Sequence, residues 1–315
     1  MNKYFLTTAL TVASASAFAQ GYGYDYNNYN YNYNYNYENQ GVTSQPEYIE
    51  NQPTYQQQAY TAEPQQQALA AKPMPHNSQA GTAERNWDFS VTVGAAYGAE
   101  YKGAKDSETT ALIAPKGEYR LDPWQKLFIS LDKGVGYSYA LTNNLEVGAG
   151  FGYRKGRDTK DARILTGLAD VDATATYMAF ATYNIDAYNL GVKIEKGLDS
   201  SNDGMTTELS AGYKTKLSPK LVVGTKLATV YGDDTYMEQN FGVYSANAGV
   251  GRGLFDAEGG FSEASLSVFG NYHIKGPHSV MGSVKYTKLL GDAKDSTITE
   301  DDSDVSAIVG YTYKF

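Results

Sequence analysis

From Trp87 to the end of the chain, apolar residues alternate with small or polar residues in segments of about ten. In the clearest segment one face is apolar and the other is glycine-rich or charged: Leu145, Val147, Ala149, Phe151 and Tyr153 against Glu146, Gly148, Gly150, Gly152 and Arg154. A period of two is that of a β-strand with two unlike faces. A soluble β-sandwich would also alternate, but it would not place Gly, Lys and Glu opposite the apolar face of every strand. A polar-filled barrel in a membrane does so, and we therefore predict an all-β, transmembrane antiparallel β-barrel.

Turn residues divide this region into twelve predicted strands, at 87–97, 109–120, 125–132, 134–141, 144–155, 172–183, 187–197, 204–217, 220–231, 262–275, 278–290 and 303–315. The connections are short after even-numbered strands and long after the first, fifth, ninth and eleventh. An even strand number with short periplasmic turns and long outer loops is typical of bacterial outer-membrane barrels. Interpreting Phe128–Leu141 as one strand would give an odd number, so we favour twelve. Both ends of the barrel domain, 87–315, are then expected to face the periplasm.

Closure of this sheet is expected, because every backbone polar group in hydrocarbon needs a partner. The last strand should therefore pair with the first. The chain also ends on an alternating aromatic strand, which resembles the terminal signal by which the barrel-assembly machinery recognises bacterial outer-membrane barrels: Tyr311, Tyr313 and Phe315.

The first nineteen residues are predicted to be a signal peptide. A short basic start precedes an apolar stretch from Tyr4 to Ala13, and Ala17–Ala19 is an A-x-A site that predicts cleavage between Ala19 and Gln20. Residues 20–86 are low in complexity and rich in Tyr, Asn and Gln. Because this segment has almost no aliphatic residues, we predict a disordered periplasmic segment, which is either a passive spacer or an arm that binds a protein or glycan.

Composition narrows the classes of function. The chain of 315 residues has no Cys, which excludes disulfides and thiolate chemistry, and its net charge of −9 argues against nucleic acid as a partner. No catalytic constellation, metal-ligand spacing or phosphate-binding loop stands out among the three histidines, His76, His273 and His278. Ser265 and Ser267 share a strand face with His273 only because the period is two. We therefore predict no enzyme activity, no cofactor and no metal.

Two charged stretches leave alternatives open. The basic stretch around Arg154 and Arg157, with Asp158 and Asp170, is either a loop held by its own Arg–carboxylate pairs or a loop that binds lipopolysaccharide phosphate or constricts a pore. The last long loop is acidic and is either simply solvated or holds cations that bridge lipopolysaccharide: Asp292, Asp295, Glu300, Asp301, Asp302 and Asp304. The inward glycines Gly148, Gly150 and Gly152 are expected to make room for opposing side chains.

Two motifs resemble a known family. Residues 152–158 (GYRKGRD) and 165–172 (LTGLADVD) are similar to the "Y-x-x-G-R-D … G-L-x-D-(I/V)-D" stretch of the MltA-interacting protein (MipA)/OmpV family. Further similar stretches are 97–103, 241–243, 289–293 and 309–315. The resemblance covers residues 87–315 and not the low-complexity segment. It implies an outer-membrane protein; some members scaffold a lytic transglycosylase and a penicillin-binding synthase, and others act as adhesins, osmotically regulated proteins or antigens.

The resulting functional prediction is a non-catalytic scaffold or interaction protein in the Gram-negative outer membrane, in contact with lipid and lipopolysaccharide. The alternatives are a diffusion channel and a surface adhesin that uses the long loops. Eight-stranded barrels are filled and sixteen-stranded ones are open, so a strand number of twelve does not decide whether the lumen is filled or open. Residues 232–261, with Phe241, Tyr244 and Phe255, are expected to fold inward as a plug, which favours the scaffold.

Overall fold

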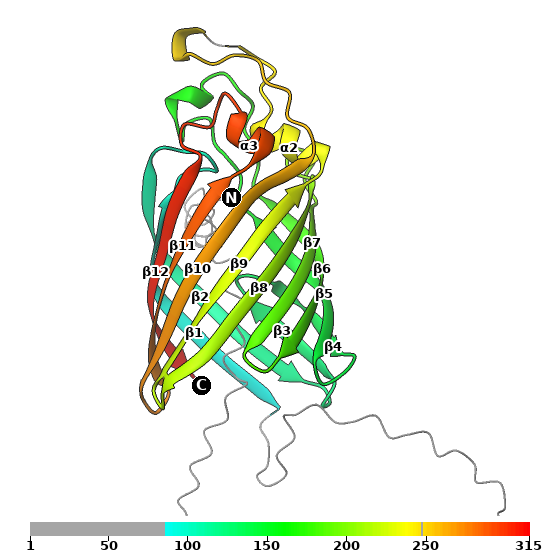
Figure 1. Ribbon diagram of the computed structural model, residues 1–315, viewed down its shortest axis with the longest axis vertical. Helices are drawn as coiled ribbons and strands as arrows, with labels where there is room; N and C mark the ends of the chain where they lie inside the picture. The colour runs from blue at the N-terminus through cyan, green and yellow to red at the C-terminus, as the bar shows by residue number, and fades with distance from the viewer. Residues whose placement is uncertain (1–85, 247) are drawn as a thin grey trace, which may run out of the picture. The chain divides into compact units, whose positions relative to one another are not determined.

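The computed structural model describes residues 86–246 and 248–315, in which twelve antiparallel strands form one closed barrel (Figure 1). The signal peptide with its Ala19–Gln20 cleavage site and nearly all of the low-complexity segment lie outside the described residues. Within them, no helix is long and apolar enough to span a membrane. The strands are β1 (Trp87–Ala99), β2 (Ser107–Arg120), β3 (Gln125–Ser130), β4 (Gly134–Ala140), β5 (Leu145–Arg154), β6 (Thr174–Ile185), β7 (Tyr188–Gly197), β8 (Met205–Ser218), β9 (Leu221–Gly232), β10 (Gly260–Lys275), β11 (His278–Leu289) and β12 (Ser303–Lys314).

The barrel closes between its first and last strands, as predicted. β1 and β12 pair antiparallel from Ser90↔Lys314 to Tyr97↔Ala307, and every other strand pairs with its sequence neighbours. The C-terminus continues this seam, because the Phe315 N–H donates to the Phe89 carbonyl over 2.9 Å and the two rings lie 5.5 Å apart. The sheet therefore has no terminal strand left without a neighbour.

The alternation in the sequence separates an apolar outer face from a mixed inner face. Val309 on β12 is 64% exposed and Phe151 on β5 is 61% exposed, whereas the β12 neighbours Ser306 and Ile308 are buried. Apolar side chains that point away from a barrel and remain exposed in the isolated chain are those that contact lipid. The inside–outside register predicted for β5 and β12 is thus confirmed.

The inward glycines make room for neighbouring side chains, as expected. Gly148 pairs with Phe180 of β6, and a Cβ at Gly148 would lie only 2.3 Å from the Phe180 Cζ atom. Gly152 similarly lies against Met178, also on β6. The small residues on β5 therefore allow large β6 side chains to lie flat along the inner wall.

The hairpin of β3 and β4 is much shorter than the other strands, with six and seven residues. β2 pairs with β3 only from Gly117 to Arg120, so the remainder of β2 has no strand partner on that side. Pro115, which has no N–H to donate, stands in this part of β2 opposite Val91 of β1. An unpaired edge at membrane depth is tolerated where it lines a water-filled cavity, and we expect lumen water to solvate this one.

The turn of the same hairpin bends into the lumen. The Lys133 Nζ atom lies 4.1 Å from the centre of the Phe180 ring, which faces inward from β6. A cation over an aromatic face is attracted by the ring quadrupole. This turn, at residues 131–133, confirms two short strands in place of one long strand over Phe128–Leu141.

The register predicts different costs for a polar substitution on the two faces of β9. Leu227 points outward and is 59% exposed, whereas Ala228 lines the lumen. Leu227→Arg should cost about 2–4 kcal/mol, because it places a cation in hydrocarbon near mid-membrane. Ala228→Ser should cost much less, and a lipid-refolding titration of both variants measures the difference.

Equal losses in the two variants would contradict the register.

Candidate functional site

The long connections fold together at one end of the barrel into what we call the cap: residues 100–106, 155–173, 198–204, 233–246, 248–259 and 290–302. The cap contains α2 (Asp234–Phe241), α3 (Gly291–Asp295) and two short 3-10 turns (Arg163–Leu165 and Ala248–Val250), and Figure 1 shows α2 and α3 at the barrel rim. Asp233 begins α2, and its carboxylate accepts a hydrogen bond from the Tyr236 N–H. Aspartate at this position satisfies a backbone donor that the helix leaves free.

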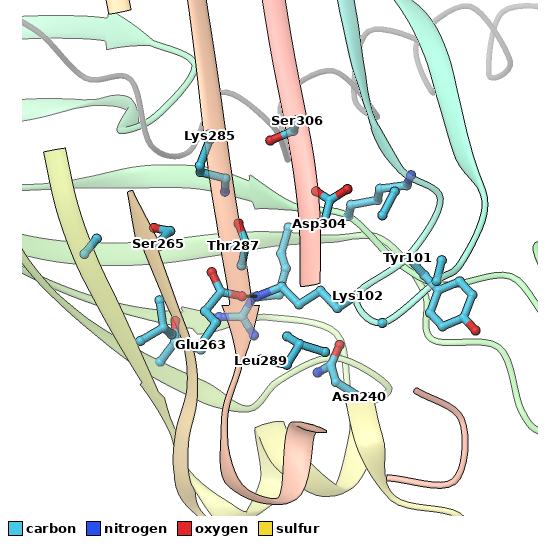
Figure 2. A pocket seen from close by; sticks show the side chains of 18 of the residues that line it. Tyr101, Lys102, Asn240, Glu263, Ser265, Lys285, Thr287, Leu289, Asp304 and Ser306 are labelled. Carbon is cyan, nitrogen blue, oxygen red and sulfur yellow. Dashed lines mark hydrogen bonds and ion pairs between the residues drawn. The ribbon is translucent and has the colours of Figure 1, made fainter. Parts of the chain in front are cut away.

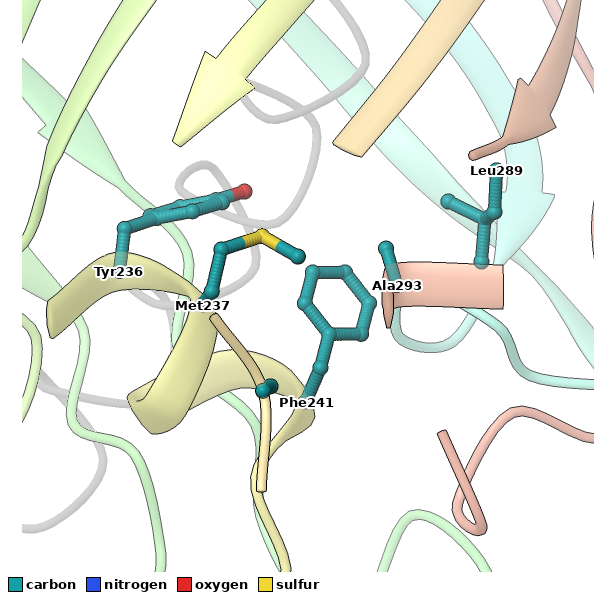
Figure 3. Close-up of a cluster of buried hydrophobic side chains, with 6 residues drawn as sticks. Tyr236, Met237, Phe241, Leu289 and Ala293 are labelled. Atoms are coloured by element: carbon teal, nitrogen blue, oxygen red, sulfur yellow. The ribbon is translucent and has the colours of Figure 1, made fainter. Parts of the chain in front are cut away.

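The cap has an apolar core of its own (Figure 3). Phe241 and Met237 of α2 are fully buried and pack with Ala293 of α3 and Leu289 of β11. A second cluster of buried side chains joins the other cap loops: Tyr101, Ala104, Leu165, Val243 and Ile298. Phe255 packs against both clusters. Such packing makes the cap a folded unit and not a set of independent loops.

The segment 232–261 lies at the rim of the barrel, where α2 packs against α3 and the ends of β8, β9 and β10. Phe241 is buried and Phe255 is partly buried, as a plug would require, but Tyr244 is 68% exposed. A cavity remains in the lumen below the cap. The expected inward plug is thus corrected to a cover at the rim, because α2 packs against α3 and the ends of the strands.

Three buried arginines connect the cap loops through backbone carbonyls. Arg154 donates to the Gly204 carbonyl (2.7 Å), Arg157 to that of Asn240 (2.6 Å) and Arg252 to that of Ile164 (2.6 Å). Burial lowers the pKa of Arg157, since loss of water disfavours the charged form, and nearby Tyr101 and Asp161 partly offset this. Hydrogen bonds to charged donors are stronger than neutral ones, so each arginine ties two distant segments together.

These contacts differ from the Arg–carboxylate pairs expected within the basic loop. Arg154 does pair with a carboxylate, at 3.5 Å, but its partner Glu195 stands on β7 and not in the loop. Within the loop the exposed pair at 3.5 Å joins a lysine, Lys160, to Asp158. Asp158 and Asp170 instead accept hydrogen bonds from the backbone N–H groups of Lys160 and Thr159. The bond from Thr159 lowers the pKa of Asp170. The two aspartates therefore shape the loop surface, while Arg154 and Arg157 lie buried beneath it.

The remaining predicted residues lie apart from one another. In the acidic loop Asp302 pairs with Lys288 at 2.6 Å, and Asp292 accepts from the Glu258 N–H. Among residues 86–246 and 248–315, no group of His, Asp or Glu has an arrangement that could hold a metal ion. His278 contacts the Tyr311 hydroxyl outside the barrel, and His76 lies outside the described residues.

A cavity of about 190 Å³ lies in the lumen beneath the cap (Figure 2). The wall from β7 to β10 gives it alternating charges, joined as Lys226–Glu208 (2.7 Å), Lys193–Glu195 (3.5 Å) and Lys102–Glu263 (2.6 Å). Burial lowers the pKa of Lys102, but the Glu263 carboxylate and Tyr236 raise it more, so that the pKa lies above its usual value. Lys102 donates to both groups and thereby connects the cap to the strands.

These lumen charges were not predicted as a site. Apart from Lys102, which stands in a cap loop, each one stands at an inward position of its strand, so alternation alone places it inside the barrel. Which charges meet depends on the register between strands. The pair of Lys226 with Glu208, for example, follows from the pairing of Gly212 with Lys226 and Glu208 with Val230, which sets the two side chains diagonally on one face.

The closed barrel with its apolar outer face and capped end defines an outer-membrane β-barrel protein. A family model described as MltA-interacting protein MipA matches residues 91–315, so the chain belongs to the MipA family. This confirms the resemblance found in the sequence.

Solved structures share the barrel form only. OmpT of Vibrio cholerae is 12% identical, with 73% of this chain and 97% of that chain covered and a TM-score of 0.33. The translocator domain of the autotransporter NalP from Neisseria meningitidis is 10% identical, with coverage of 74% and 89% and a TM-score of 0.39. No curated protein matches the chain. Likenesses this low carry no argument about function.

Because the cap has its own apolar core, we predict that the cap can lose its folded structure while the barrel keeps its own. Phe241→Ala removes a fully buried ring, a change that typically costs about 3–5 kcal/mol, and should make residues 233–259 sensitive to protease. Limited proteolysis in lipid, followed by mass spectrometry of the fragments, measures this. Tyr244→Ala, in the same segment but on the surface, should leave the cleavage pattern unchanged.

The barrel itself should remain folded in both variants, as judged by heat-modifiable migration in electrophoresis. Protease resistance of the Phe241→Ala cap would mean that the apolar core does not hold the cap in place.

Proposed function

We propose that this protein is a non-catalytic scaffold of the outer membrane that binds enzymes of peptidoglycan synthesis and hydrolysis. The observation that carries the proposal is the folded cap, which covers the end of the barrel with two apolar clusters and three buried arginines. A diffusion channel needs an open mouth. The family name, MltA-interacting protein, supports a lytic transglycosylase as one partner.

The proposed partner surface is the end of the barrel opposite the cap, which we place in the periplasm together with both termini. The turns there are short, such as residues 122–124, 142–144 and 218–220. Short turns alone do not bury the roughly 1,200–2,000 Å² of a stable interface. The Tyr/Asn/Gln-rich segment, residues 20–86, adds contact area at an ordering cost, so the binding is expected to be weak or transient.

The three C-terminal aromatics are proposed to serve assembly of the barrel. Tyr313 and Phe315 lie edge to face with ring centres 4.9 Å apart, and Phe315 is 50% exposed on the outer face. An exposed aromatic end on the closing strand is accessible to the barrel-assembly machinery before the seam with β1 forms.

A diffusion channel is the second candidate, because the lumen retains a charged cavity. Its lining includes Lys193, Glu195, Glu208 and Lys226. Charged rings are the usual means by which pores select ions. Opening such a path requires the cap to leave the mouth, and single-barrel recordings in planar bilayers test that directly.

The scaffold proposal predicts binding of a purified lytic transglycosylase to the full-length protein in lipid nanodiscs. Deleting residues 20–86 should weaken this binding, because the short turns remain as the only contact, while residues 87–315 keep their heat-modifiable fold. Biolayer interferometry of the two forms against the same enzyme gives the comparison.

An unrelated outer-membrane barrel of similar charge serves as the control for nonspecific binding. Steady ion conductance by the full-length protein, with no transglycosylase bound in nanodiscs and none recovered by crosslinking in cells, would instead support the channel.

A further inference from the structure

One cavity lysine differs from the others. Lys102, Lys155, Lys193 and Lys226 each have a carboxylate within 3.5 Å of their ammonium group. Lys285 of β11 also lines the cavity (Figure 2), but within the described part of the chain no carboxylate oxygen lies within 4.0 Å of its Nζ atom and no hydrogen bond engages it. Its ammonium group therefore has three donors to offer.

Hydroxyl groups surround this lysine on three strands. The register places Ser267 of β10 and Ser306 of β12 directly beside Lys285, one on each side. Thr287 and Ser283 stand two residues away along β11, and all four side chains face the lumen.

Three of these hydroxyls are buried without a partner. The side-chain oxygens of Ser283, Thr287 and Ser306 make no hydrogen bond, and the three residues are 5%, 8% and 1% exposed. A buried hydroxyl without a partner costs free energy, and such groups call for an explanation such as a bound ion or water. One ammonium group among hydroxyl donors is a chemistry that suits an oxyanion.

We propose that Lys285, Thr287 and Ser306 form a binding site for a single oxyanion group, a carboxylate or a phosphate, carried by a small molecule. The neighbouring acids are engaged elsewhere: Glu263 pairs with Lys102, and Glu208 pairs with Lys226. Asp304 accepts hydrogen bonds from backbone N–H groups of Ala99 and Val305. These carboxylates still repel anions, so the site favours a ligand with one charged group, and the cavity of about 190 Å³ limits its size.

The test uses the full-length mature protein in zwitterionic lipid nanodiscs with acetate as the probe. Saturation-transfer NMR should show transfer to the acetate methyl group, and inorganic phosphate should compete while chloride at equal ionic strength should not. Lys285→Gln should weaken acetate binding at least about tenfold, because it removes a charged donor. Lys285→Arg should restore most of it, and Thr287→Val combined with Ser306→Ala should weaken it about threefold or more.

Lys126→Gln is the matched control, since it removes the same charge from the lumen outside this cavity, where Lys126 pairs with Glu118 and Glu146. Acetate binding should be unchanged in this variant. Each variant is first checked for heat-modifiable migration, so that a loss of fold is not read as a loss of binding. Equal losses in Lys285→Gln and Lys126→Gln, or no transfer to acetate in the unmodified protein, would overturn the proposal.

Discussion

The constraint on which the whole structure depends is that backbone N–H and C=O groups in hydrocarbon must find partners within the protein. The pairing of β1 with β12 satisfies it for the sheet as a whole, and the Phe315–Phe89 hydrogen bond extends that seam to the last residue. One stretch of β2 is an exception to this pairing. Where the short β3–β4 hairpin leaves β2 unpaired, the chain places Pro115 near the end of the pairing and turns Lys133 inward. We expect lumen water to solvate the backbone groups that a neighbouring strand would otherwise have paired.

Closure also creates an enclosed interior, and the chain fills that interior differently at different heights. Along the wall near the short hairpin, aromatic rings lie against glycines, as Phe180 does against Gly148. Nearer the cap the wall carries ion pairs, and Lys102 reaches down from a cap loop to Glu263. Pairing offsets part of the desolvation cost of enclosed charges of this kind. The network therefore holds the cap to the barrel as well as neutralising the lumen.

The proposed function rests on the cap. Its loops come from five separate parts of the sequence, and buried arginines join them through backbone carbonyl groups, with Glu195 as a further partner of Arg154. A carbonyl partner does not require a second charge to be buried, which lowers the desolvation cost of the contact. With that end covered, the proposed exchange with partners takes place at the opposite end, and the oxyanion site proposed around Lys285 lies in the space that the cap encloses.

The barrel could be predicted from the local pattern of the chain. Alternation in β5 and β12 set the two faces, the even number of segments and the loop lengths set the topology, and the family motifs in 152–172 agreed with both, because a period of two is a local property of each strand. Alternation also placed Glu208 and Lys226 inside the barrel. Which groups meet came from the three-dimensional packing: Arg154 with the Gly204 carbonyl, Lys102 with Glu263, and Lys285 beside Ser306. Such contacts depend on the register between strands and on loops that pack across the barrel end, and neither is encoded within a single segment of the chain.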